Sequence, residues 1–414
     1  MTSPLSGAPS RLGPRPLPLH LMTATSAWLS SRAASPFLKN GLLPWKPALA
    51  KAGRDLQEQL AGVANESFAE ALDREIRTQA DAFLTGLERY RSHPYRRVVP
   101  EVPVVWQEGS TRLLDYAPGG GVPILVVPSL VNRAYILDLL EDQSLLRFLA
   151  SAGFRPLLVD WGRPQELERG FGLTDYVAGR LDAASEAAAA LVGGPLVLMG
   201  YCMGGLVGLA LAQRRRSLVR ALVLLATPWD FHAERSEQAR LLAAAAPAIC
   251  AACGPLGEIP TDLLQSLFLS LDPYLAVRKF SRFASLAEES EAAKRFVALE
   301  DWLNDGVPLA LPTARECLEG WYGANDPAQG NWRIAGGAVD PSRYDGPALV
   351  VTSARDRIVP FASAEALVGR LPRGTHYPLR LGHIGMVASS QAQKQLWEPL
   401  VDWLREQWPK GAVS

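Results

Sequence analysis

The chain has 414 residues, of which 48% are hydrophobic, and its 42 basic residues equal its 42 acidic residues. A net charge of zero provides no global electrostatic attraction to nucleic acid, so a nucleic-acid-binding protein is not expected. The length allows two average domains or one large α/β domain with insertions. The four cysteines show no spacing typical of a disulfide framework, which favours a reducing compartment and therefore the cytoplasm.

The first 54 residues differ in charge from the rest of the chain. They carry seven basic residues, at positions 11, 15, 32, 39, 46, 51 and 54, and no acidic residue precedes Asp55. Two interpretations fit this composition, namely a mobile tail and a basic, apolar arm that adheres to a hydrophobic or anionic surface. From Asp55 to about Tyr90 apolar residues recur at helical spacing. Residues 1–99 are therefore expected to form a basic tail followed by amphipathic helices.

Apolar strands alternate with helices from about residue 100 onward. The expected strands lie at 102–105, 112–116, 123–128, 156–161, 196–199 and 221–226, and the expected helices at 144–152 and 174–191. The strand at 123–128 is a continuous apolar run, which is typical of a strand buried on both faces. Strands that alternate with helices in this way favour a parallel sheet. Residues 100–227 are therefore expected to form the first part of an α/β core.

The alternation of strands and helices stops between residues 228 and 340. This stretch is rich in proline, tryptophan and leucine and contains helical pieces without a clear buried strand, so we interpret it as an inserted helical cap. Its Ala-rich segment 241–252 is short and interrupted by Pro247, so no membrane-spanning helix is expected. The second part of the core, residues 341–414, is expected to contain strands at 348–352 and 377–381 and helices at 363–371 and 393–408.

A thiol lies where a strand, a glycine turn and a helix meet. Residues 200–205 read Gly-Tyr-Cys-Met-Gly-Gly, which follows the G-x-nucleophile-x-G elbow of α/β hydrolases, with Cys202 where most members have serine. Gly200, Gly204 and Gly205 suit a strained turn after which a helix passes close to its own strand. The sequence therefore predicts an α/β-hydrolase fold, with a mostly parallel sheet, an inserted helical cap and an N-terminal helical extension.

An acid and a base follow the elbow in the chain order that this fold uses. Asp356 follows the strand at 348–352, and His383 follows the strand at 377–381. Because the carboxyl ends of parallel strands meet at one edge of the sheet, both side chains are expected near Cys202. Among the five histidines of the chain, only His383 has this setting. The alternative for Asp356 is a turn or helix-capping aspartate.

Other reactive residues have simpler interpretations. Cys250 and Cys253 lie in the Ala-rich segment without a second pair, so buried thiols are expected there in preference to a metal or redox site. Trp302 and Asp305 are expected to fix the cap onto the core. His232 is a candidate for lining the pocket, although a loop histidine without a role in the site is the simpler interpretation.

Several blocks of the sequence resemble polyhydroxyalkanoate synthases, most closely the class III catalytic subunit. That family's G-x-C-x-G-G box is matched by Gly200, Cys202, Gly204 and Gly205. Further matching blocks, in the family's order, are LVNRAYILDL at 130–139, VDWG at 159–162, LTDY at 173–176, WLNDGVP at 302–308 and GHIG at 382–385. The resemblance covers about residues 102–408. It does not extend to the first hundred residues, and Arg357 stands where many members have histidine.

The resemblance implies a catalytic triad of Cys202, Asp356 and His383. It implies that the Cys202 thiolate takes the acyl group of a 3-hydroxyacyl-CoA thioester, and that a 3-hydroxyl group then attacks the acyl-enzyme with Asp356 or His383 as the base. The oxyanion of the tetrahedral intermediate would be held by the backbone N–H groups of Met203 and Val131. No cofactor or metal is expected, because the substrate is itself a CoA thioester.

The expected function is thus a polyhydroxyalkanoate synthase that polymerises 3-hydroxyacyl-CoA, with 3-hydroxybutyryl-CoA as the expected monomer, and releases CoA. Two alternatives remain open at this point. One is a depolymerase or thioesterase with the same triad, and the other is a non-catalytic granule-associated protein. Expected partners are the growing polyester chain, a class III-type second subunit in a homo- or hetero-oligomer, and the surface of a polyester granule in the cytoplasm, with no nucleic acid.

Overall fold

The computed structural model describes residues 11–408, which divide into two compact units. The first unit combines the N-terminal residues up to Tyr95 with residues 265–304, and the second combines residues 96–264 with the chain from Asp305 onward. The division falls inside one helix, α8 (Thr261–Leu269).

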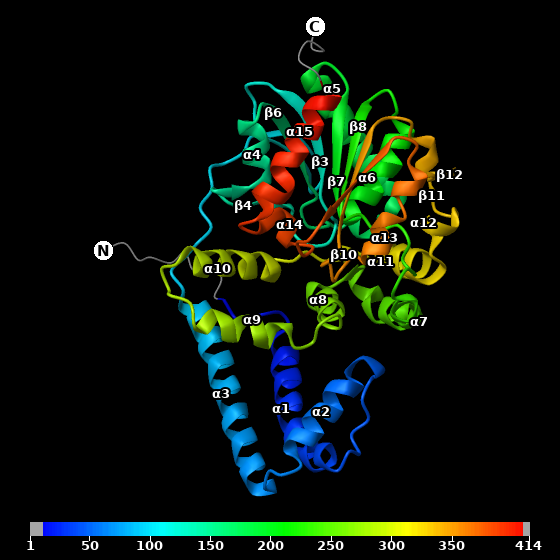
Figure 1. The fold of residues 1–414 in the computed structure, drawn as a ribbon. Coiled ribbons are helices and arrows are strands. Elements are labelled where there is room, and N and C mark those ends of the chain that lie inside the picture. The colour runs from blue at the N-terminus through cyan, green and yellow to red at the C-terminus, as the bar shows by residue number, and fades with distance from the viewer. Residues whose placement is uncertain (1–10, 409–414) are drawn as a thin grey trace. The chain divides into compact units, whose positions relative to one another are not determined.

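The second unit is built on an eight-stranded sheet with the order β1-β2-β6-β3-β7-β8-β13-β14 (Figure 1). Its strands are β1 (Val104–Glu108), β2 (Thr111–Asp115), β3 (Val122–Val127), β6 (Phe154–Asp160), β7 (Leu196–Tyr201), β8 (Val219–Leu225), β13 (Ala348–Ser353) and β14 (Gly374–Leu379). The pairs β1–β2 and β2–β6 are antiparallel, and the other five pairs are parallel. The prediction of an α/β fold with a mostly parallel sheet is confirmed.

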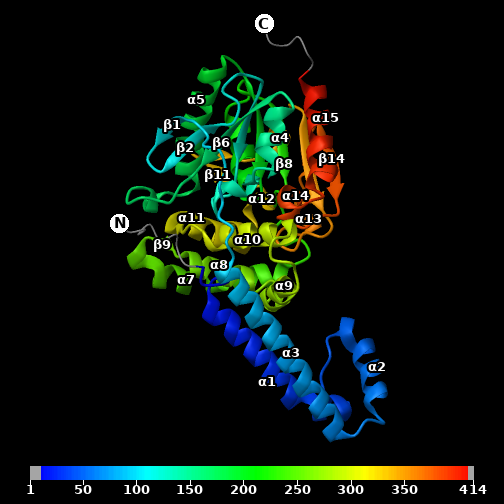
Figure 2. The same cartoon turned by 90° about the vertical axis from the view of Figure 1, so that its left-hand side faces the viewer.

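Continuous apolar strands form the centre of the sheet. All residues of β7 and β13 are buried, and so are all but the first residue of β3. Such strands need helices on both faces, and α5 and α15 lie on opposite sides of the sheet (Figure 2). The helices of this part are η2 (Ala134–Leu137), α4 (Leu145–Ser151), η3 (Glu168–Gly170), η4 (Asp175–Leu181), α5 (Asp182–Val192), α6 (Met203–Arg214), η7 (Pro341–Arg343), α13 (Phe361–Glu365), η8 (Val368–Arg370), α14 (Gly385–Ala388), η9 (Gln393–Trp397) and α15 (Glu398–Gln407).

Residues 228–340 are mainly helical, as the sequence predicts. Besides α8 they form α7 (Ser236–Cys253), η5 (Gly254–Leu256), α9 (Leu275–Ala284), α10 (Glu291–Asn304), α11 (Leu311–Arg315), η6 (Glu316–Ala324) and α12 (Asp326–Gln329). Short strands occur as well. They are β9 (Glu258–Ile259) paired with β10 (Leu309–Ala310), both buried, and β11 (Arg333–Ile334) paired with β12 (Gly337–Ala338). A further short pair, β4 (Asp138–Leu140) and β5 (Gln143–Ser144), precedes α4.

The two compact units divide the stretch 228–340 between them. Residues 265–304 belong to the same unit as the N-terminal residues, and the cap assigned to 228–340 stays a prediction. The segment Ser236–Leu256 is long and apolar enough to cross a membrane by length and composition, with a mean hydropathy of 1.5, and 22% of the window is buried. Pro247 lies inside α7 without ending it. Length and composition do not distinguish such a helix from one in a soluble protein.

The first unit is a group of helices around an aromatic core. It contains α1 (Leu17–Lys39), η1 (Pro47–Leu49), α2 (Ala50–Leu60) and α3 (Asn65–Ser92), together with α9 and α10. Phe83 of α3 packs edge-to-face on Phe280 of α9, with ring centroids 6.2 Å apart, and Ala24 of α1 is buried in the same cluster. Residues 17–39 are therefore helical and packed, which rules out a wholly mobile tail; residues 1–10 lie outside the described part.

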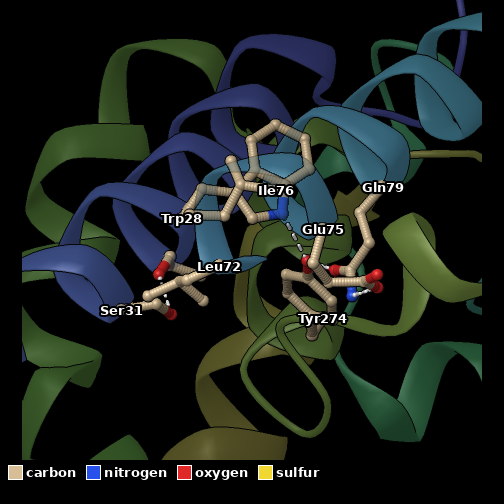
Figure 3. Close-up of a pocket in the computed structure, with 8 residues that line it drawn as sticks. Trp28, Ser31, Leu72, Glu75, Ile76, Gln79 and Tyr274 are labelled. Carbon is tan, nitrogen blue, oxygen red and sulfur yellow. Dashed lines mark hydrogen bonds between the residues drawn. The ribbon is translucent and has the colours of Figure 1, made fainter. Parts of the chain in front are cut away.

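A cavity of about 360 Å³ lies between α1, α3 and Tyr274 in this unit (Figure 3). Its polar groups bond one another in a chain. Trp28 Nε1 donates to the Tyr274 hydroxyl at 2.7 Å, this hydroxyl donates to Gln79 Oε1 at 3.1 Å, and Gln79 Nε2 donates to Glu75 Oε1 at 2.9 Å. The chain ties α1, α3 and the segment before α9 together, so we assign these residues a structural role.

The close contact of α3 with α9 depends on Gly86. A Cβ atom built at this position would meet the carbonyl oxygen of Phe280. Although alanine favours a helix over glycine by about 1 kcal/mol, we expect Gly86→Ala to destabilise the protein by about 1–3 kcal/mol because the two helices must separate. Urea denaturation followed by circular dichroism measures this difference.

The matched control is Gly179→Ala. Gly179 is also helical, but a Cβ there meets nothing within 4 Å. This substitution is expected to leave stability unchanged or to raise it. Equal effects of the two substitutions would contradict the role assigned to Gly86.

Candidate active site

Cys202 occupies a strained turn between β7 and α6. Its backbone has a φ of 55° and a ψ of −125°, which a side-chain-bearing residue adopts only when its surroundings enforce it. A Cβ atom at Gly200 would meet the Cα of Gly205, and one at Gly205 would meet the Thr227 hydroxyl. The helix therefore passes its strand at backbone contact, and the thiol is presented at the start of α6.

Asp356 and His383 lie after successive strands, as expected. Asp356 follows β13 and His383 follows β14, and His383 Nδ1 lies 2.6 Å from Asp356 Oδ2. The other carboxylate oxygen, Oδ1, accepts the N–H groups of Ile358 at 2.8 Å and Val359 at 2.9 Å. Both side chains are buried. The carboxylate is thus held in place by the backbone and in turn orients the imidazole.

The imidazole of His383 also bonds the side chain of Cys202. Burial lowers the pKa of His383, but the charge of the Cys202 thiolate, hydrogen bonds to Asp356 and Cys202, and the charge of Asp356 together raise this pKa to about 10. Cys202, His383 and Asp356 therefore form one hydrogen-bonded chain. The raised pKa means that the imidazole keeps its proton at neutral pH when it faces the thiolate.

Tyr201 supports the histidine from a second side. Its ring lies 5.2 Å from the His383 ring at an angle of 30°, and its hydroxyl donates to the backbone carbonyl of His383 at 3.0 Å. Burial, followed by the charges of Cys202 and Asp356, raises the pKa of Tyr201, so the phenol stays neutral. In the sequence, Tyr201 occupies only a variable position of the G-x-nucleophile-x-G pattern. Its position next to Cys202 is the feature that could have identified it as a site residue.

The two expected oxyanion-hole amides differ in their bonding. Met203 is the first residue of α6, where an N–H group has no acceptor within the helix. The N–H of Val131, by contrast, donates to the Ser129 hydroxyl at 3.1 Å. This is a local turn in which a serine side chain replaces a backbone acceptor. The Val131 N–H is therefore already hydrogen-bonded in this structure. It can bind an oxyanion only if its bond to Ser129 breaks.

Residues after β8 bring further groups to the thiol. Tyr322 lies on η6, and burial together with the charges of Cys202 and Cys317 raises its pKa. Its ring lies 5.0 Å from that of Phe231, and its backbone carbonyl bonds Nε2 of His232 at 2.8 Å. His232 thus anchors η6, and Tyr322 is a site residue that the sequence interpretation missed. Its stretch, Trp-Tyr-Gly at 321–323, matches no motif.

The remaining candidates have structural surroundings. Asp305 forms an ion pair with Arg133 at 3.5 Å, which links the residue that follows α10 to the loop after β3. Cys250 and Cys253 are buried free thiols, as the sequence predicts. Within residues 11–408 no group of three or more histidine, cysteine or acidic side chains is placed to hold a metal ion.

Comparison with known proteins gives one family model and several relatives. The model described as alpha/beta hydrolase fold matches residues 123–385. The poly(3-hydroxyalkanoate) polymerase subunit PhaC of Allochromatium vinosum is 33% identical over 291 residues, which cover 69% of this chain and 81% of that protein. The PhaC subunit of Thiocystis violacea is 30% identical, covering 73% of this chain and 87% of its own length.

Two further similarities are more partial. The PhaC subunit of Haloferax mediterranei is 31% identical over 74% of this chain, which spans 64% of that relative. Among solved structures, a non-heme bromoperoxidase, BpoC, from Mycobacterium tuberculosis has a TM-score of 0.48 and 16% identity, covering 76% of this chain and 99% of its own.

The bonding of His383 predicts how its titration responds to loss of the thiol. We expect His383 to stay protonated up to about pH 10 in the unsubstituted protein. Cys202→Ala removes the thiolate charge and one hydrogen bond, both of which raise the pKa, while burial still lowers it. The pKa should therefore move down, and an NMR titration of the histidine ring signals measures the shift.

The control for this titration is Cys250→Ala, which removes a buried thiol on α7. It should leave the titration of His383 unchanged. An unaltered His383 pKa in Cys202→Ala would show that the thiolate does not set it.

Proposed function

This chain belongs to the family of poly(3-hydroxyalkanoate) polymerases, which have the α/β-hydrolase fold, and we propose that it polymerises 3-hydroxyacyl-CoA through an acyl-enzyme on Cys202. The observation that carries the proposal is the hydrogen-bonded chain Cys202–His383–Asp356 beside a strained elbow. A thiolate paired with an imidazolium is the arrangement that makes cysteine a nucleophile at neutral pH.

In the first step the Cys202 thiolate attacks the thioester carbonyl of the substrate. A carbon–sulfur bond to Cys202 forms, the bond to the CoA sulfur breaks, and the protonated His383 gives its proton to the departing CoA thiolate. Stabilisation of the tetrahedral oxyanion by the N–H of Met203 is supported by its position as the first residue of α6, where this N–H has no acceptor within the helix. One thioester replaces another of similar energy, so the acyl group stays activated and no cofactor is needed.

In the second step a 3-hydroxyl group attacks the acyl-enzyme, and its proton must pass to a base. His383 is neutral after protonating CoA, and its Nδ1 already bonds Asp356, which leaves Nε2 for the incoming hydroxyl. Both oxygens of Asp356 are occupied, one by His383 and one by two backbone N–H groups. These contacts favour His383 as the base and give Asp356 the role of orienting it.

The same proposal extends to partners and location. The growing polyester is the second substrate, and the relatives are each named as a subunit, which supports assembly with a second subunit in a homo- or hetero-oligomer. A CoA substrate and a nucleophilic thiol that must remain reduced support a cytoplasmic site of action, at the surface of the polyester granule.

Incubation with 3-hydroxybutyryl-CoA tests the reaction. We expect release of CoA together with insoluble polymer, and Cys202→Ala should lower the rate by about a thousandfold or more because the acyl-enzyme cannot form. Cys250→Ala is the control and should retain activity. CoA release with only free acid would instead identify a depolymerase or thioesterase, and full activity of Cys202→Ala would refute the thiol mechanism.

The roles of Asp356 and His383 can be separated with Asp356→Asn. If Asp356 only orients His383, this substitution should slow acylation and chain transfer by similar factors, about 10²- to 10⁴-fold. Single-turnover measurements of CoA release and of acyl transfer give the two rates. Acylation at an undiminished rate with accumulation of acyl-enzyme would show instead that Asp356 is the base for transfer.

A further inference from the structure

Helix α1 carries an apolar face that the rest of its unit leaves uncovered. Met22 is 65% exposed, Leu29 67%, and Phe37 is also exposed. At 100° per residue these three side chains fall within about 80° of one another, along about 22 Å of helix. The opposite face holds the buried Ala24, which packs in the aromatic core with α3 and α9. Helix α1 thus has apolar residues on two opposite faces. Only the face that contains Ala24 packs against other helices of this unit.

The exposed apolar surface continues beyond the end of α1. Leu42, Trp45 and Leu49 are exposed in the segment that leads to α2. The Trp45 ring packs on the backbone of α2, since a Cβ atom at Gly53 would meet it, so the ring is fixed at the surface. Ten of the twenty exposed large hydrophobic side chains of the described residues lie between residues 12 and 63. This concentration distinguishes the segment from the rest of the molecule.

The charge of the same segment has one sign. Every charged residue before Asp55 is basic, and the side chains of Lys46 and Lys51 are exposed next to the apolar residues. Helices that lie in the interface of an anionic bilayer typically combine exposed leucine, phenylalanine and tryptophan with neighbouring lysine. Tryptophan and lysine both combine an apolar part with a polar end that remains at the headgroups.

We propose that residues 17–51, the basic apolar arm, bind a lipid surface that carries anionic headgroups. Met22, Leu29 and Leu42 enter the boundary between headgroups and acyl chains, and Lys46 and Lys51 contact headgroup phosphates. Arg32 is already paired with Asp73, and Lys39 bonds Val63 and Asn65. The exposed Lys46 and Lys51 are thus the basic groups available to headgroups, and a purely apolar surface gives them no partner. A symmetric contact between two copies brings the same basic segment against itself, which like-charge repulsion opposes.

Sedimentation with lipid vesicles tests the proposal on the full chain. We expect binding to vesicles of phosphatidylcholine and phosphatidylglycerol, about tenfold or more weaker binding to pure phosphatidylcholine, and loss of binding as salt is raised. The triple variant Met22→Gln, Leu29→Gln, Leu42→Ser should bind anionic vesicles about tenfold or more weakly. The double variant Lys46→Gln, Lys51→Gln should lose about tenfold as well, and circular dichroism checks that both variants are folded.

Two exposed leucines elsewhere provide matched controls. Leu241, which is 72% exposed on the apolar helix α7, is changed to Gln, and Leu167 to Ser. Neither change should reduce binding. A loss with Leu241→Gln equal to that of the triple variant would assign the lipid contact to α7 and overturn the proposal. Equal binding to neutral and anionic vesicles would also overturn it, as would a triple variant that changes only the oligomeric state.

Discussion

The active site depends on the distance at which α6 passes β7. Gly200 and Gly205 allow the two backbones to touch, and Gly204 meets the carbonyl oxygens at the end of β3 in the same way. Any side chain at these positions would push the helix from the sheet. Because the helix is held so close, Cys202 must turn through a positive φ, and this turn aims the thiol at the edge where β13 and β14 end. The strain at one residue is thus maintained by three glycines.

His383 connects this turn to the chemistry. It bonds Asp356 with one ring nitrogen, faces Cys202, and is held through its ring and its backbone carbonyl by Tyr201, the residue that precedes the nucleophile. The elbow therefore supplies both the proposed nucleophile and a support for the proposed base. With Asp356 fixed by two backbone N–H groups, the chain has little freedom, which preserves its geometry through the two opposite proton transfers that the proposed cycle needs.

The sequence predicted the parts of this arrangement that follow from local pattern and strand order. Apolar runs located the strands, and the ends of consecutive parallel strands brought Asp356 and His383 to Cys202. Contacts between distant segments leave no such signal: the packing of α3 on α9 rests on Gly86, an unremarkable helical glycine in the sequence. The bonding of the Val131 amide could not be predicted either. Its N–H donates to the Ser129 hydroxyl, and a serine in a loop has many acceptable rotamers.

The choice between water and a hydroxyl as acceptor must be made by residues around the thiol, since the triad serves both. The neutral phenol of Tyr322 lies near Cys202, and the ring of Phe231 contacts Tyr322 and stacks on Trp321 at 5.6 Å. In the proposed cycle these aromatic residues, all between β8 and β13, lie beside the acyl-enzyme. We therefore expect a hydrolase and a polymerase with identical triads to differ in this segment.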